Sequence, residues 1–239
     1  GSTDLFTVVL NAQPTTDVVL SISSADTGEA TVTSSLTFTS SNWDTAKTVT
    51  VTGVDDNIID GTQTSTITVS IIDGISDNAF DAVADQTVSV TTTDDDVAGF
   101  TIAETEGSTG VDESGSTDIF TIVLDTQPSS DVVLSITSSD TGEATVESLI
   151  QFTSANWDTA QNVTVTGADD GIIDGTQTST ITVTVVDAIT DDDFDAVADQ
   201  TVSVATTDDD VAGFTIAETE GSTGVDESGS TDIFTVVLN

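Results

Sequence analysis

The feature that most constrains the fold of this chain is a long internal repeat. The hexapeptide Gly-Ser-Thr-Asp-(Leu or Ile)-Phe begins at Gly1, Gly115 and Gly229, so the repeat has a period of 114 residues in a chain of 239. Residues 97–114 and 211–228 are identical. Repeats that stack as a solenoid are only about 20–45 residues long, whereas a unit of this length can hold a core of its own. The sequence therefore predicts tandem domains built on one plan.

Each copy of the repeat closes on three consecutive aspartates, at 94–96 and 208–210. Dividing the chain there predicts a domain at 1–96 that lacks its first strand, a complete domain at 97–210, and the first strands of a third at 211–239. We expect the chain to be a window on a longer array. The last segment then either stays loose or fills the missing-strand position of a neighbouring copy, which is a known mode of binding.

Within the complete repeat, Val and Ile alternate with Thr and Ser at the two-residue period of half-buried strands. No segment shows helical periodicity. Seven strands are predicted, at 99–104, 118–124, 131–137, 149–153, 162–166, 179–186 and 201–206. The side chains expected to face inward on the second and third strands are Phe120, Ile122, Leu124, Val132, Leu134 and Ile136. The predicted fold is all-β, a tandem array of antiparallel β-sandwich domains of immunoglobulin-like type.

The charge balance excludes several classes of partner. The chain has 43 acidic residues and one basic residue, Lys47, for a formal charge of −42. Such a chain repels nucleic acid and anionic lipid. Because Cys and His are absent, disulfides, thiolate chemistry and His-ligated metals are excluded. No run approaches the ~18 apolar residues of a membrane span, so direct membrane insertion is not expected.

The acidic residues converge in the predicted topology. If successive strands run in alternate directions, the first, third and fifth loops and the end of the last strand share one pole. Those segments carry Asp112, Glu113, Asp140, Glu143, Asp169, Asp170, Asp174, Asp208, Asp209 and Asp210. Like charges about 4 Å apart repel by about 4 kcal/mol at an effective dielectric near 20, and Ca²⁺ takes six to eight such oxygens. The pattern favours a calcium site; the alternative is a solvated acidic end that keeps the chain soluble.

Other candidate sites are weaker. Asp191-Asp-Asp-Phe-Asp195 has the spacing that opens an EF-hand loop, but Ala196 and Val202 stand where the loop needs Gly and Glu. Trp157 and its copy Trp43 are expected to be partly buried caps, with a sugar-stacking surface as the alternative. Paired carboxylates can hydrolyse glycosides, but an enzyme does not usually repeat its site in every module, so no enzymatic activity is expected.

Three features together resemble a known family. They are the segment Val-Thr-Gly-Ala-Asp-Asp-Gly-Ile-Ile-Asp at 165–174, the closing aspartate triplet, and a Glu near the first turn. The pattern Phe-Thr-x-x-Asn-Trp at 152–157, followed by the strand at 163–167, is common in the same group. The combination resembles the Calx-β domain and, more closely, the related immunoglobulin-like repeats of very large adhesins of aquatic bacteria. The likeness covers each whole repeat.

The resemblance implies calcium bound at the distal loops. By matching motif, the implied ligands are Glu113, Asp169, Asp170, Asp174, Asp208, Asp209 and Asp210 in the complete repeat, and Asp55, Asp56, Asp60, Asp94, Asp95 and Asp96 in the first. Glu143 and Glu29 lie in the loop that supplies another ligand in the family. Two positions that are often acidic in the family are Asn57 or Gly171, and Gln63 or Gln177, which implies fewer ions or weaker binding.

The function expected from these observations is mechanical. The chain resembles the extender, or stalk, of an extracellular bacterial adhesin or the body of a surface filament, with calcium rigidifying the junctions between domains. Its expected partners are neighbouring repeats of the same chain and other copies in a filament, at the cell surface. The alternative is a surface module that binds glycan or protein through its polar-end loops or the Trp region.

Overall fold

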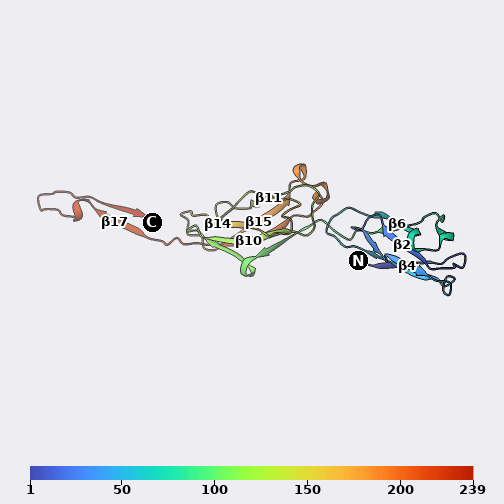
Figure 1. The fold of residues 1–239 in the computed structure, drawn as a ribbon. Coiled ribbons are helices and arrows are strands. Elements are labelled where there is room, and N and C mark those ends of the chain that lie inside the picture. Colours follow the sequence, from blue (N-terminus) through green and yellow to red (C-terminus); the bar gives the residue numbers. More distant parts are fainter. Residues whose placement is uncertain (239) are drawn as a thin grey trace. The chain divides into compact units, whose positions relative to one another are not determined.

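The computed structural model describes residues 1–238, which are almost entirely β-strands and turns (Figure 1). The chain forms two compact units, unit 1 (Gly1–Val97) and unit 2 (Ala98–Asn239). Short 3₁₀ turns interrupt the strands: η1 (Asp73–Ile75), η2 (Asn78–Phe80), η3 (Thr105–Gly107), η4 (Asp187–Ile189), η5 (Asp192–Phe194) and η6 (Thr219–Gly221). None of the described helices is long and apolar enough to cross a membrane.

Residues 98–210 of unit 2 form a complete β-sandwich. Its strands are β8 (Phe100–Glu104), β9 (Thr109–Asp112), β10 (Thr117–Leu124), β11 (Val132–Ser138), β12 (Ala144–Val146), β13 (Leu149–Phe152), β14 (Gln161–Gly167), β15 (Gln177–Val185) and β16 (Gln200–Thr207). One sheet has the order β12-β14-β10-β8 and the other β13-β11-β15-β16-β9. The pairs are antiparallel except β9 with β16, which is parallel. The all-β sandwich prediction is confirmed.

The core lies between these two sheets. The inward residues predicted on β10 and β11 are all buried, and Phe152, Phe194, Val163 and Ile181 complete the same cluster. Thr and Ser occupy the alternate, outward positions, as suits a half-solvated sheet surface. Trp157 is partly buried and packs against this core, which agrees with the expected role as a cap.

Two strands of this sandwich lie outside the seven predicted. β9 and β12 are four and three residues long, too short for alternation to be read from sequence. β9 includes Gly110, and its partner β16 lies almost a hundred residues away in the chain. Both short strands end beside acidic positions, so they matter for the site.

Unit 1 has the same plan with fewer strands. They are β1 (Thr3–Val8), β2 (Val18–Ser24), β3 (Ala30–Val32), β4 (Ser35–Phe38), β5 (Lys47–Gly53), β6 (Gln63–Ile71) and β7 (Gln86–Thr92), in sheets ordered β1-β5-β3 and β4-β2-β6-β7. The β1–β5 register repeats that of β10–β14. Within Gly1–Val97 no strand corresponds to β8 or β9.

Residues 211–238 contain a hairpin of β17 (Phe214–Glu218) and β18 (Phe234–Leu238). Its antiparallel register, Phe214 opposite Leu238, repeats that of β8 with β10, where Phe100 lies opposite Leu124. The hairpin therefore repeats the β8–β10 pairing at the start of a third copy of the repeat.

Candidate metal centre

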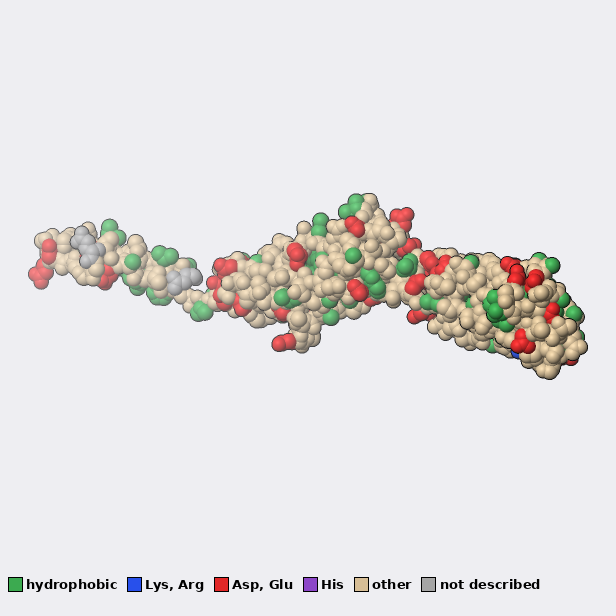
Figure 2. Space-filling model, viewed as in Figure 1, with side chains coloured by type: hydrophobic (Ala, Val, Ile, Leu, Met, Phe, Trp, Pro, Cys, Tyr) green, Lys and Arg blue, Asp and Glu red, His purple; other side chains and the backbone are tan. Residues whose placement is uncertain are grey.

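Acidic side chains gather at one end of the complete sandwich, where the chain leaves β16 towards residue 211 (Figure 2). Four segments meet there: the end of β9, the turn before β12, the loop after β14 and the residues after β16. These are the loops that the alternating strand directions placed at one pole.

Glu113 lies at the centre of this acidic end. Its backbone N–H donates to Thr207 O at 3.1 Å, which extends the parallel β9–β16 pairing by one residue. This pairing places Glu113 inside the acidic end of the sandwich, where the residue is only 1% exposed. Neither carboxylate oxygen of Glu113 has a hydrogen-bond partner among the described residues. A buried carboxylate without a partner is strongly unfavourable unless something compensates its charge.

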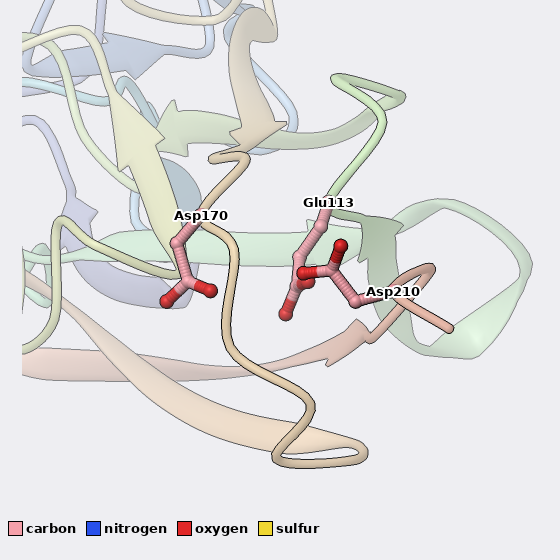
Figure 3. A group of neighbouring side chains, drawn as sticks. All are labelled: Glu113, Asp170 and Asp210. Carbon is pink, nitrogen blue, oxygen red and sulfur yellow. The ribbon is translucent and has the colours of Figure 1, made fainter. Parts of the chain in front are cut away.

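Glu113 belongs to two groups of carboxylates. In one group, oxygens of Glu113, Asp170 and Asp210 all lie within 4.8 Å of one another; in the other, the same holds for Glu113, Glu143 and Asp174. Figure 3 shows the three carboxylates of the first group brought together from separate segments of the chain. One oxygen of Glu143 and one of Asp210 are also buried without a partner in the described structure.

Asp208 organises the loops rather than joining these groups. Its carboxylate accepts hydrogen bonds from the backbone N–H of Gly175 and of Asp210, both at 2.8 Å. Gly175 has φ of 76°, a left-handed conformation in which a side chain is disfavoured. These hydrogen bonds hold the pKa of Asp208 below its ordinary value. Asp208 thus fixes the positions of Asp174 and Asp210 relative to each other.

Burial and mutual repulsion raise the pKa values of the central acids. Burial first, then the charges of Asp208 and Glu143, raise the pKa of Glu113 to about 7. Burial and the nearby Asp174 raise the pKa of Glu143. Burial and the charge of Asp208 raise the pKa of Asp210. The folded structure without a cation therefore disfavours the ionised form of these three acids.

Other predicted acidic residues lie outside the two groups. Asp209 is exposed, because alternation along the extended chain turns it away from Asp208 and Asp210, and Asp169 is exposed as well. Asp112 accepts from the Ser114 hydroxyl within the β9–β10 turn. Asp140 accepts from Gly142 N–H at 2.9 Å within its own loop. Their ligand roles stay predictions.

The residues present fit a hard cation such as Ca²⁺. Its preferred ligands are carboxylate and carbonyl oxygens, and the groups provide oxygens that make no hydrogen bond within residues 1–238. Glu113 is common to both groups, so one carboxylate can serve two neighbouring cation positions. A cation there would compensate the charge of a glutamate that burial otherwise leaves uncompensated.

Unit 1 repeats part of this arrangement. Asp94 accepts from Gly61 N–H and Asp96 N–H, both at 2.8 Å, as Asp208 does in unit 2. A hollow of ≈ 20 Å³ lies among the acidic residues, which are Glu29, Asp55, Asp56, Asp60, Asp94, Asp95 and Asp96. Burial and neighbouring aspartates raise the pKa values of Glu29 and Asp96. No residue of Gly1–Val97 corresponds to Glu113, and the described part of this unit holds no comparable three-carboxylate group.

Asp191, weighed above as an EF-hand position, has a structural role that the sequence did not reveal. It is buried and accepts from Ser130 N–H at 2.7 Å, from the Ser129 hydroxyl at 2.8 Å and from Asp193 N–H at 3.2 Å. It thereby caps η5 and ties that turn to the loop before β11. Asp77 repeats these contacts in unit 1. The signal available in the sequence was an Asp directly before a turn, which is typical of a cap.

The fold and site together define a class: tandem β-sandwich modules with carboxylates clustered at one end. No family model matches the chain, and no curated protein matches it. Among solved structures, domains 4 and 5 of the S-layer protein SbsC are 17% identical, covering 79% of this chain and 70% of that one, with a TM-score of 0.34. The calcium binding domain CBD12 of CALX1.1 is 14% identical, covering 76% and 73%, with a TM-score of 0.34.

An endo-fucoidan hydrolase from glycoside hydrolase family 107 is also similar, at 14% identity over 79% of this chain and 23% of that one, with a TM-score of 0.28. Similarities of this size do not assign a function.

Proposed function

We propose that this chain is a structural repeat of an extracellular surface protein, an extender of an adhesin or the body of a surface filament, whose modules bind calcium at their acidic ends. Bound calcium would rigidify the junction between one module and the next. The proposal involves no catalytic step.

The observation that carries the proposal is the buried Glu113 carboxylate, whose oxygens find no hydrogen-bond donor among the described residues. An acidic end that is only solvated would keep all of its carboxylates in water, as Asp169, Asp170, Asp174 and Asp209 are. Glu113 instead lies among carboxylates from three other segments. A cation is the simplest compensation for that charge, because the chain has only one basic side chain.

The residues that would hold the cation also control where the chain leaves the module. Glu113 anchors the end of β9, Asp170 and Asp174 belong to the loop after β14, and Asp210 directly precedes Val211, where the next repeat begins. A cation shared by these residues would fix the direction of residues 208–210. Without it, the carboxylates repel one another and the connection is freer to bend.

An extracellular location agrees with this chemistry. Calcium sites of extracellular modules are often weak, with dissociation constants of about 10⁻⁴–10⁻³ M, and such sites fill only where calcium is abundant. The high negative charge also keeps the chain soluble.

Calorimetric titration of calcium into the whole chain tests the proposal. We expect saturable binding that Glu113→Gln and Asp210→Asn each weaken by at least about tenfold, since ligand charge sets affinity in such sites. Glu147→Gln, at an exposed carboxylate outside both groups, is the matched control and should bind nearly as wild type. Equal affinities for all three variants and the wild type, or no saturable binding, would contradict the proposal.

A further inference from the structure

β9 is an edge strand that few interactions hold to the complete sandwich. It pairs in parallel with β16 over four residues, from Thr109 beside Val204 to Asp112 beside Thr207. Thr109 and Val111 are its two buried side chains, and only Val111 is apolar. The strand therefore has a single apolar anchor in the core.

The loop before β9 is loosely packed as well. Residues 105–108 carry the chain from the sheet of β8 to the sheet of β9, and they project from the sandwich as a green loop in Figure 1. A hollow of ≈ 430 Å³ is lined by Thr105, Glu106, Ser108, Gly110 and Asp118. Glu106 has φ of 59°, a left-handed conformation that is unfavourable for a residue with a side chain. Release of β9 would let Glu106 leave this conformation.

Glu113 follows β9 directly, so the position of its carboxylate depends on the pairing of this strand. The Glu113 N–H donates to Thr207 O at 3.1 Å, and its carboxylate oxygens are buried without a hydrogen-bond partner in residues 1–238. On the other side of the strand, an added Cβ at Gly167 of β14 would lie 1.9 Å from Asp112 O. The backbone that leads into Glu113 is thus enclosed between β14 and β16, and it must move out for the carboxylate to reach water.

A bound cation changes the sign of this balance. Without one, pairing of β9 brings the Glu113 carboxylate up to those of Asp170 and Asp210 (Figure 3) and of Glu143 and Asp174. Desolvation and like-charge repulsion then oppose the pairing. With Ca²⁺ among these oxygens, the same carboxylates hold the end of β9 in place. Segments with few buried apolar contacts are the first to open when such support is lost.

The rest of the sheet does not depend on Glu113. β15 pairs with β16 over seven residues and with β11 over five. Its inward residues Ile181 and Val183 are fully buried in the apolar core. Loss of the cation should therefore release β9 without unfolding the sandwich.

We propose that calcium at the acidic end controls the pairing of β9 with β16. When calcium is bound, β9 completes the five-stranded sheet; when calcium is removed, residues 105–113 detach and leave the edge of β16 unpaired. The inference rests on the proposed calcium function and adds a second effect to it, because the cation closes the module as well as fixing the connection that follows. Strand pairing and calcium binding are then reciprocal, and each favours the other.

Thiol labelling of the whole chain tests the proposal, because the chain has no cysteine of its own. Val111→Cys places one thiol on the buried side of β9. Ser179→Cys places one on the buried side of β15 and is the matched control. At one fixed pH, the Val111→Cys thiol should react at least about tenfold faster in chelator than in calcium, because local opening exposes it. The Ser179→Cys thiol should react slowly in both conditions.

Glu113→Gln supplies a comparison in which no charge is buried. Added to Val111→Cys, it should leave the thiol slow to react in chelator as well. Equal labelling of Val111→Cys in calcium and chelator overturns the proposal, and so does equal acceleration of both thiols in chelator, which shows that the whole module unfolds. Calorimetric titration of the same proteins distinguishes the two ideas: saturable binding with unchanged labelling contradicts strand release alone, whereas no binding contradicts the calcium function itself.

A disulfide between β9 and β16 tests the reciprocity. Gly110 and Ala205 are directly paired and both exposed, so Gly110→Cys with Ala205→Cys joins the strands outside the core. Oxidation holds β9 in the paired state and should raise the calcium affinity of the monomer at least about tenfold, because the paired state is the one that binds. Thr180→Cys with Ser203→Cys, paired between β15 and β16, is the matched control and should not change the affinity. An affinity that oxidation of the first pair leaves unchanged contradicts the proposal.

Discussion

At the scale of single residues, Glu113 combines burial with carboxylate oxygens that have no hydrogen-bond partner in the described structure. It is nearly fully buried, its oxygens are unpaired, and its carboxylate faces those of Asp170, Glu143, Asp174 and Asp210. Its position follows from one backbone hydrogen bond to β16. The site therefore depends on a strand pairing as much as on acidic composition.

Replacing the Glu113 carboxylate should change the melting temperature in opposite directions without and with calcium. In chelator, Glu113→Gln should raise the melting temperature of unit 2, because the variant buries no charge among like charges. In calcium, the order should reverse, since the wild type gains stability from a bound ligand and the variant gains less. Thermal unfolding under the two conditions measures both effects.

The control for this variant is Glu147→Gln, at an exposed position of the same sandwich. It should melt as wild type under both conditions. A Glu113→Gln variant that is less stable than wild type in chelator would show that Glu113 is satisfied without a cation, and the proposed calcium site would lose its main support.

The raised pKa of Glu113 predicts how stability depends on pH without calcium. Its folded value of about 7 exceeds its ordinary value of 4.5. Because the folded state binds this proton more tightly than the unfolded state, protonation of Glu113 stabilises the fold. That stabilisation is complete below the pKa of the unfolded state and is lost as the pH rises through 7. In chelator, denaturant unfolding should therefore show stability falling between about pH 4.5 and pH 7.

Three further groups contribute to how stability depends on pH. Glu143 and Asp210 also have raised pKa values and act in the same direction. Asp208 has a lowered pKa, so its contribution is lost only as the pH falls below about 4. Saturating calcium should flatten the slope above pH 4.5, because it competes with protons for the same oxygens. A rise of stability with pH in chelator would be the opposite of the expectation.

The sequence predicted which residues could form this centre but not which would face inward. Strand parity placed the right loops at one pole, and the structure brings Glu113, Glu143, Asp170, Asp174 and Asp210 together there. The exposed position of Asp209 could have been predicted from alternation within the triplet. The burial of Glu113 could not, because it depends on the parallel pairing of β9 with a strand distant in sequence.

At the scale of secondary-structure elements, alternation was sufficient for the long strands. It identified the inward residues of β10 and β11 correctly because strands of eight and seven residues contain several repeats of the two-residue alternation. β9 and β12 were missed because three or four residues cannot establish a period. Their existence is set by neighbours: β12 pairs with β14, and β9 with β16.

The loop between β15 and β16 offers a test of the fold that does not depend on metal. Asp191→Ala removes the acceptor for Ser130 N–H, the Ser129 hydroxyl and Asp193 N–H. Leaving such donors without a partner costs about 1–3 kcal/mol. Urea unfolding in chelator should show that loss, with calcium affinity in native conditions unchanged.

Asp193→Ala is the matched control, because the Asp193 side chain is exposed two residues away. Its stability should stay within about 0.5 kcal/mol of wild type. If Asp191→Ala instead abolished calcium binding while leaving stability intact, the loop would be a metal site rather than a structural tie.

At the scale of the whole molecule, the repeat places one acidic end after another along the chain. The aspartate triplet of each module leads directly into the next repeat. We propose that calcium at these ends limits how freely one module moves relative to the next.

If calcium at the acidic ends fixes the direction in which one module follows another, the chain should be more extended when calcium is bound. Small-angle X-ray scattering of the whole chain, recorded in calcium and then in chelator, measures this difference. We expect a larger maximum dimension and less conformational spread in calcium, with both effects reduced when Glu113→Gln removes the centre at the end of unit 2. Identical scattering curves in calcium and chelator would contradict the proposed role of calcium.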